Sequence, residues 1–162
     1  MRCAEVSRRT GETDINISLD IDGQGTSNLD TGMGFFEHML NLFTTHGQFN
    51  LKVECSGDLF VDGHHSVEDI GIALGQAFTK AMGDKVGIKR YGTAFVPMDE
   101  ALIMVSLDLS GRAFLNYEVL VKAQMIGDYD TELTEEFLRA FAFNAGITLH
   151  VKMMAGSNSH HI

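Results

Sequence analysis

Two pairs of adjacent histidines are the residues of this sequence best suited to chemistry. The first pair stands within residues 62–69, which read DGHHSVED, and the second closes residues 156–161, which read GSNSHH. Neutral imidazole is a preferred protein ligand for divalent metal ions, whereas two neighbouring imidazoles repel each other once charged and pack poorly in a core. Paired histidines that occur twice therefore indicate metal binding.

A carboxylate stands at the right distance from the first pair. Glu68 follows His64 by four residues and His65 by three, so on a helix it shares a face with either imidazole. Neighbouring side chains on a helix point about 100° apart, which favours two metal ions over one. This mixed nitrogen and oxygen set fits Mn²⁺, Fe²⁺ or Zn²⁺ without a thiolate to favour Zn²⁺. Asp62 and Asp69 are predicted to accept hydrogen bonds from the imidazole N–H groups.

An internal duplication must position both pairs. Residues 12–23 read ETDINISLDIDG and residues 100–111 read EALIMVSLDLSG, with six of twelve positions identical. Asp-Thr at 30–31 recurs at 130–131, and the two histidine pairs follow in the same order. We predict one domain spanning 1–162, with one repeat over about 1–88 and a second over about 89–162.

The hydrophobic pattern predicts the elements of each repeat. Alternation indicates strands over 13–21, 51–53, 102–109, 113–121 and 147–154, and apolar residues at helical spacing indicate helices over 32–46, 64–81 and 131–145. Symmetry predicts a further helix from His160, with its glutamate at position 164, so that the last helix lies outside the 162 residues. The fold class is α+β: duplicated half-domains, each a β-sheet face covered by two helices, packed with pseudo-twofold symmetry.

Composition narrows the class of function. The net charge of −10 disfavours a protein that binds the nucleic-acid backbone, because such proteins need a concentrated basic face. No apolar run has the length of a membrane span, and the first residues lack the apolar core of a signal peptide. Cys3 and Cys55 form no disulfide framework, so a reducing, cytoplasmic compartment is expected, with neither nucleic acid nor membrane as a partner.

A series of short motifs stands in order from about Glu5 to Ile162: RTGET (9–13), TGMGFFEHML (31–40), GDLFVDGHHSVED (57–69), RYG (90–92), PMDE (97–100), DLSGR (108–112), DTEL (130–133), LH (149–150) and GSNSHH (156–161). One HHxxE motif alone would be weak evidence for any family. The whole series in this order resembles the imidazoleglycerol-phosphate dehydratases and is specific to that family.

The resemblance implies a hydro-lyase of histidine biosynthesis that converts imidazole glycerol phosphate to imidazole acetol phosphate. It implies two Mn²⁺ ions, which bind the two nitrogens of the substrate ring and hold it as an imidazolate that can expel the neighbouring hydroxyl. The motif positions carry over as metal ligands onto His38, His64, His65, Glu68, His150, His160 and His161. An eighth ligand would be the glutamate expected at 164.

The resemblance also implies the remaining site residues. Glu12 corresponds to an acidic residue near the substrate and is the candidate for proton transfer, although its repeat partner Glu100 allows a purely structural role for both. Guanidinium groups bind phosphate in bidentate fashion, which makes Arg90 and Arg112 the candidate phosphate ligands. Further candidates are His46 and Gln48 for the substrate, and Arg9 and Lys89 for the phosphate.

Two other functions stay open from the residues alone. A dinuclear metallohydrolase would account for the histidines and the glutamate but not for the other motifs. A metal-binding or assembly subunit without activity would account for an incomplete ligand set. The resemblance further implies a homo-oligomer of 24 subunits, with metal sites at subunit contacts and assembly promoted by metal.

Overall fold

The computed structural model describes residues 2–162, and its first half is a sheet covered by two helices. The strands are β1 (Cys3–Arg9), β2 (Thr13–Asp20), β3 (Thr26–Asp30) and β4 (Asn50–Gly57), in the order β1-β2-β4-β3. Strand β4 pairs antiparallel with β2 and parallel with β3. Helices α1 (Gly34–Gly47) and α2 (His64–Met82) follow β3 and β4 along the chain.

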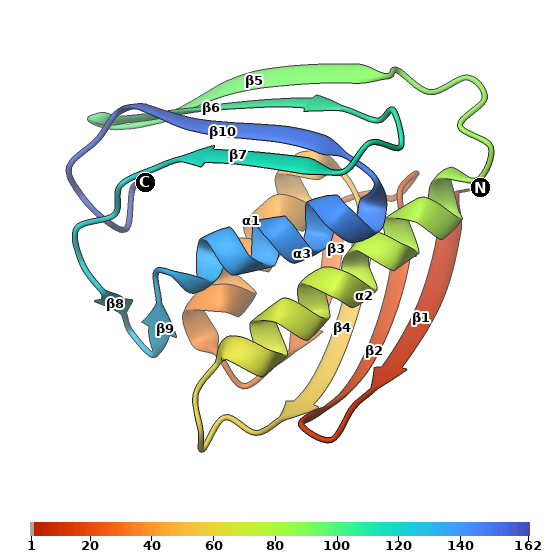
Figure 1. The fold of residues 1–162 in the computed structure, drawn as a ribbon, viewed down its shortest axis with the longest axis horizontal. Coiled ribbons are helices and arrows are strands. Elements are labelled where there is room, and N and C mark those ends of the chain that lie inside the picture. Colours follow the sequence, from red (N-terminus) through yellow and green to blue (C-terminus); the bar gives the residue numbers. More distant parts are fainter. Residues whose placement is uncertain (1) are drawn as a thin grey trace.

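The second half repeats this topology. Its strands β5 (Tyr91–Met98), β6 (Ala101–Asp108), β7 (Phe114–Glu118) and β10 (Thr148–Ala155) have the order β5-β6-β10-β7. A small ribbon of β8 (Met125–Ile126) and β9 (Tyr129–Asp130) precedes α3 (Leu133–Ala145). The three helices lie between the two sheets (Figure 1). The predicted α+β duplication is therefore confirmed.

Equivalent positions in the two halves can be read from the strand pairing. An offset of 88 residues relates β1 and β2 to β5 and β6, so that Ile15 corresponds to Ile103. An offset of 98 residues relates β4 to β10, because Ser18 pairs with Lys52 and Ser106 pairs with His150. The same offset of 98 relates the left-handed residue that ends α1, Gln48, to Gly146, which ends α3.

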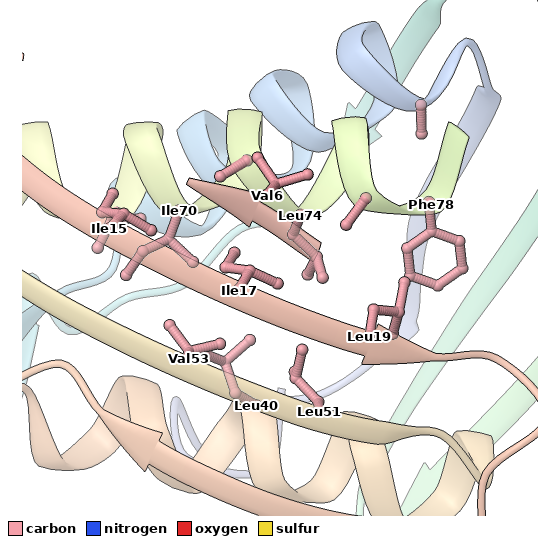
Figure 2. Packing of buried hydrophobic residues seen from close by; sticks show 14 of the residues in the cluster. Val6, Ile15, Ile17, Leu19, Leu40, Leu51, Val53, Ile70, Leu74 and Phe78 are labelled. Carbon is pink, nitrogen blue, oxygen red and sulfur yellow. The ribbon is translucent and has the colours of Figure 1, made fainter. Parts of the chain in front are cut away.

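The hydrophobic core lies between the first sheet and its helices. Ile15 and Val53 of the sheet and Ile70 of α2 are fully shielded from solvent, with no exposed surface. Figure 2 shows these side chains meeting those of Leu74 and Leu40, the latter from α1. Burial of each such side chain stabilises the fold by about 1.5–3 kcal/mol, which fixes α2 and its first turn on β1 and β2.

Helices α2 and α3 cross in close contact through two glycines. A methyl group at Gly71 would lie 2.8 Å from the carbonyl oxygen of Phe137, and one at Gly75 would lie 2.7 Å from that of Phe141. The glycines are four residues apart and share one face of α2. Only hydrogen side chains allow the two backbones to approach this closely, so the pair sets how the halves pack together.

The second sheet is covered less completely than the first. Val6 is 5% exposed beneath α2, whereas Val96 on the equivalent strand β5 is 59% exposed. An apolar cavity of about 250 Å³ lies between α1 and the second sheet, lined by residues such as Met39 and Phe43 of α1 and Ile103 of β6. The predicted helix from His160 is absent from the described residues, where residues 158–162 form a turn instead, with the Ile162 N–H donating to the Asn158 carbonyl.

Candidate functional site

The first histidine pair forms the start of α2. The Asp62 carboxylate accepts a hydrogen bond of 2.8 Å from the backbone N–H of His64, which fixes the turn that enters the helix. His64 Nε2 lies 3.6 Å from Glu68 Oε2, one helical turn along. The rings of His64 and His65 are perpendicular, with centroids 6.2 Å apart. The two imidazoles therefore point in different directions, as two separate metal ions would require.

His65 is held by a carboxylate that sequence reasoning missed. Its Nδ1 lies 2.9 Å from Oδ2 of Asp58, whose side chain is 15% exposed in the loop before α2. The other oxygen of Asp58 is buried and has no hydrogen-bond partner among the described residues. The hydrogen bond to Asp58 raises the pKa of His65. Since Nδ1 faces Asp58, Nε2 is the nitrogen left for a ligand.

The prediction that Asp62 and Asp69 accept from imidazoles is wrong. Asp62 binds a backbone N–H, and the buried Asp69 carboxylate accepts from Arg8 at 3.0 Å and from the Thr13 hydroxyl at 2.6 Å. Asp69 thereby ties the first turns of α2 to the β1–β2 hairpin. Glu12 stands in the turn of that hairpin, so this network holds the candidate acid near the first histidine pair.

The second histidine pair is held in a similar way by a residue of the β5–β6 turn. His161 Nδ1 lies 2.8 Å from Glu100 Oε2. The other Glu100 oxygen accepts from the backbone N–H groups of Ser157 and Asn158, at 3.1 and 2.7 Å. The hydrogen bond from His161, together with these backbone donors, lowers the pKa of Glu100 to about 2. The loop that carries the second pair is thus fixed to the end of the sheet.

His38 of α1 joins the second pair. Its ring stacks on that of His160, with centroids 6.0 Å apart, and Phe35 packs edge-on to His160 at 5.6 Å. The rings of His160 and His161 lie 6.4 Å apart at 78°. Three predicted ligands from α1 and the loop after β10 therefore gather at one place.

His150 lies apart from this group. It is an exposed residue of β10 between the buried Leu149 and Val151, so its side chain stands on the sheet face opposite to theirs. Its ring lies 6.0 Å from that of Phe114, and its equivalent in the first half is Lys52. Within one chain His150 is not brought to the other histidines, and its role as a ligand stays a prediction.

The equivalent of His38 in the second half is Glu136, which is not among the predicted site residues. The offset of 98 residues that relates the helix ends also relates His38 to Glu136. Glu136 and His64 line one cleft of about 590 Å³, whose wall also carries Asp62, Asp128, Asp130 and Glu132. So many carboxylates give the cleft a negative charge that suits cations. Aligning α1 with α3 would have found Glu136 from the sequence.

One chain does not complete a metal site. Within residues 2–162, no group of three or more histidine, cysteine, aspartate or glutamate side chains is arranged to hold a metal ion. The predicted ligands instead form two partial clusters, one at the start of α2 and one around His38 and His160. The donors fit divalent ions in type, since each second histidine leaves Nε2 free, but the set closes only if further ligands arrive from elsewhere.

The two candidate phosphate ligands converge on one carboxylate. Arg90 binds Asp108 through two nitrogens at 2.7 and 3.0 Å, and Arg112 reaches the same carboxylate at 3.5 Å. Both guanidinium groups are partly exposed, at 49% and 74%. A phosphate of higher charge can compete for two such groups at once. Of the other candidates, Arg9 pairs with Asp14 at 3.6 Å, and Lys89 is exposed.

These arginines are far from the first histidine pair of the same chain. The Lys85 side chain, just after α2, donates to the backbone carbonyl of Leu109. The backbone N–H of Leu109 in turn donates to the backbone carbonyl of Arg90. The arginines thus lie near the end of α2 at Met82, and the 18 residues from His64 span about 27 Å. No phosphate ester of substrate size bridges that distance, so the two groups cannot serve one substrate within one chain.

His46 and Gln48 lie at the far end of α1 from His38. Gln48 has a left-handed backbone (φ 59°), and its side-chain amide donates to the Thr45 carbonyl at 3.1 Å. Eight residues separate His46 from His38, which is about 12 Å along the helix. A substrate-binding role for His46 and Gln48 is therefore separate, within one chain, from the cluster at His38.

Fold and site together define a class: a duplicated α+β protein with a paired histidine motif in each half. A family model described as imidazoleglycerol-phosphate dehydratase matches residues 31–162. The chain is 62% identical over 158 residues to the imidazoleglycerol-phosphate dehydratase of Acetivibrio thermocellus, covering 98% of this chain and 81% of that protein. It is 61% identical to that of Thermoanaerobacter pseudethanolicus, covering 100% and 84%.

Solved structures agree with this assignment. The Staphylococcus aureus imidazoleglycerol-phosphate dehydratase superposes with a TM-score of 0.88 at 42% identity, covering 98% of this chain and 88% of that one. The Pyrococcus furiosus protein, solved in complex with (S)-C348, gives 0.83 at 32% identity, covering 96% and 83%. The chain belongs to the imidazoleglycerol-phosphate dehydratase family, and it is a hydro-lyase of histidine biosynthesis. None of the helices within residues 2–162 has the length and apolarity needed to cross a membrane.

Proposed function

We propose that the dehydration takes place at a dinuclear Mn²⁺ site assembled from several copies of this chain. The observation that carries the proposal is the separation of parts within one copy. The two histidine clusters are each incomplete, and the arginine pair lies about 27 Å from the first cluster by helix length. A symmetric homo-oligomer brings different ends of neighbouring copies together and so supplies the missing groups. The assembly expected from the resemblance has 24 subunits.

The ligands proposed for the two ions come from both clusters. His64, His65 and Glu68 offer two imidazoles and a carboxylate at the start of one helix, and His38, His160 and His161 offer three imidazoles around one loop. His150 is retained as a seventh ligand on the resemblance alone, and only a neighbouring copy could bring it into reach. The negative cleft beside His64 supports cation binding at the first cluster.

The substrate chemistry explains why these groups are needed. The hydroxyl that departs is next to an imidazole ring, and the carbon-bound proton that must leave is not acidic. Divalent ions held by these histidines and Glu68 would supply positive charge that stabilises negative charge on the ring, which favours loss of the neighbouring hydroxyl. Glu12, exposed in the β1–β2 turn, transfers the proton, and Arg90 and Arg112 hold the phosphate. Cytoplasmic location is proposed from the sequence alone.

Product analysis tests this proposal. With Mn²⁺ and imidazole glycerol phosphate, the protein is expected to form one ketone per substrate without releasing phosphate. Glu12→Gln should lower kcat by about 100-fold or more because proton transfer is lost, while Mn²⁺ binding stays unchanged. Glu5→Gln, at an exposed position of β1, is the matched control and should keep full activity. Release of phosphate would refute the proposed dehydration. Full activity of Glu12→Gln would refute the role of Glu12 in proton transfer.

A further inference from the structure

The two halves hold their histidine pairs with carboxylates from different places. In each pair the second histidine, His65 or His161, has its Nδ1 against a carboxylate oxygen, at 2.9 and 2.8 Å. In the first half the carboxylate is Asp58, from the loop before α2. In the second half it is Glu100, from the β5–β6 turn. The contact between Nδ1 and a carboxylate thus occurs in both halves, although the carboxylate comes from a different residue in each.

The duplication shows that these carboxylates are not equivalent. A bulge between Met153 and Ala155 adds one residue to β10, so that Gly57 corresponds to Gly156 and Asp58 to Ser157, which has no carboxylate to offer. The offset of 88 residues takes Glu12 to Glu100. The same imidazole contact has therefore been retained from two unrelated positions. Chance placement of polar residues would not be expected to give one geometry twice.

The surroundings of each carboxylate keep it in place. Asp58 is mostly buried, and its second oxygen is shielded from solvent without a partner. Both Glu100 oxygens are engaged, one by His161 and the other by two backbone N–H groups. Glu12, by contrast, is exposed, and its only hydrogen bond within residues 2–162 is donated by its backbone N–H to Thr10. Glu12 is free to move a proton, whereas Glu100 is not.

We propose that Asp58 and Glu100 are positioning residues, which hold the Nδ1–H of His65 and of His161 and so present each Nε2 as a metal ligand. Asp58 has the same role at His65 as Glu100 has at His161. Glu12 is therefore not needed to hold a histidine and stays available for proton transfer. A carboxylate on the non-ligating nitrogen fixes both the tautomer and the orientation of a metal-binding imidazole. The inference rests on the proposed metal site, but its geometry exists without metal.

Histidine tautomers in the metal-free protein give the first test. Long-range ¹H–¹⁵N NMR spectra of the full chain, at a pH where the imidazoles are neutral, should show His65 and His161 with the proton on Nδ1. Asp58→Ala should shift His65 towards the Nε2–H tautomer, which free imidazole side chains favour, and Glu100→Ala should do the same to His161 alone. Asp58→Asn and Glu100→Gln keep an acceptor oxygen and should restore the Nδ1–H form.

A further variant tests the division of roles between the halves. Glu12→Ala should leave the tautomers of both His65 and His161 unchanged, although Glu12 is the repeat partner of Glu100. Persistence of the Nδ1–H form in folded Asp58→Ala and Glu100→Ala would overturn the proposal. A shift at His65 in Glu12→Ala would overturn the assignment of that role to Asp58.

Mn²⁺ affinity gives the second test. Titration followed by the electron paramagnetic resonance signal of free Mn²⁺ should show about 10- to 100-fold weaker binding in Asp58→Ala and Glu100→Ala. Asp14→Ala removes a carboxylate that pairs with the exposed Arg9, and this variant should bind as the unmodified protein does. Equal affinity in all variants would overturn the positioning role. Failure of the unmodified protein to bind Mn²⁺ would instead refute the proposed metal site. The tautomer measurement would still decide whether Asp58 and Glu100 hold the two histidines.

Discussion

At the scale of single residues, a buried tyrosine connects the ribbon before α3 to α1. Tyr129 is 4% exposed, its ring stacks on that of Phe36 with centroids 5.9 Å apart, and its hydroxyl lies 3.1 Å from the Thr134 hydroxyl. Burial raises the pKa of Tyr129 to about 12 and, in the same way, that of Tyr117 to about 12. These phenols are neutral in the fold at pH values where an exposed phenol ionises.

The consequence is a loss of stability in alkali. A tyrosine in the unfolded chain ionises near pH 10.0. Below that pH the phenol is protonated in both the folded and the unfolded state, so the stabilisation linked to its raised pKa is fully present. As the pH rises from about 10 to about 12, the unfolded state releases its proton first and stability falls, by about 2–3 kcal/mol for the buried Tyr129. Tyr129→Phe should make this fall shallower while Tyr117 still titrates. Urea unfolding at several pH values measures it, and an unchanged slope would contradict the account.

The chemistry-bearing residues could be predicted from the sequence to the extent that their types are distinctive. The paired histidines and the glutamate one helical turn away are recognisable from the sequence as candidate ligands, and the structure places them at the start of a helix. The acceptor for His65 could not be predicted, because Asp58, Asp62 and Asp69 are all near in sequence. Only the folded loop shows that Asp62 faces a backbone N–H and that Asp69 is claimed by Arg8.

At the scale of elements, the α2–α3 crossing depends on the absence of side chains. Gly71→Ala would add a methyl group 2.9 Å from the Ala140 Cβ and 2.8 Å from the Phe137 carbonyl oxygen. Backbone cannot move aside cheaply, so the free energy of unfolding should fall by about 1–3 kcal/mol. Gly11→Ala, where the new methyl meets nothing within 4 Å, is the control. Denaturant unfolding of both variants measures the difference, and equal stability would disprove a tight crossing.

The predicted elements divide by how much of each faces the core. Strand β2 was predicted because apolar residues alternate along it, and these residues are buried in the structure. The helices were predicted because apolar residues recur at helical spacing, and these residues also face the core. Strands β1, β3 and β5 were not predicted. All three lie at sheet edges, where β1 buries only Val6 and β3 has Leu29 as its one large apolar residue, whereas the edge strand β7 was predicted within 113–121. An edge strand with few buried apolar residues is specified mainly by pairing with its neighbour, and pairing leaves little trace in local sequence.

At the scale of the whole molecule, assembly and metal binding are expected to depend on each other. If ligands from several copies complete each site, metal stabilises the contacts between copies by mass action. Removal of metal with a chelator should lower the particle mass measured by light scattering, and Mn²⁺ should restore it. Mg²⁺, which prefers oxygen ligands, should restore it poorly. An unchanged mass after complete metal removal would contradict a metal-linked assembly.

Complementation between inactive variants tests most directly whether the site is shared. His65→Ala removes a proposed metal ligand, and Arg112→Ala removes a proposed phosphate ligand, so each variant alone should lack dehydratase activity. If the two groups serve one substrate from different copies, co-expression of both variants in equal amounts should restore about one quarter of full activity, since half of the positions of each kind are intact. If both groups act within one chain, no copy is complete. The mixed assembly would then stay inactive, and the proposed shared site would be wrong.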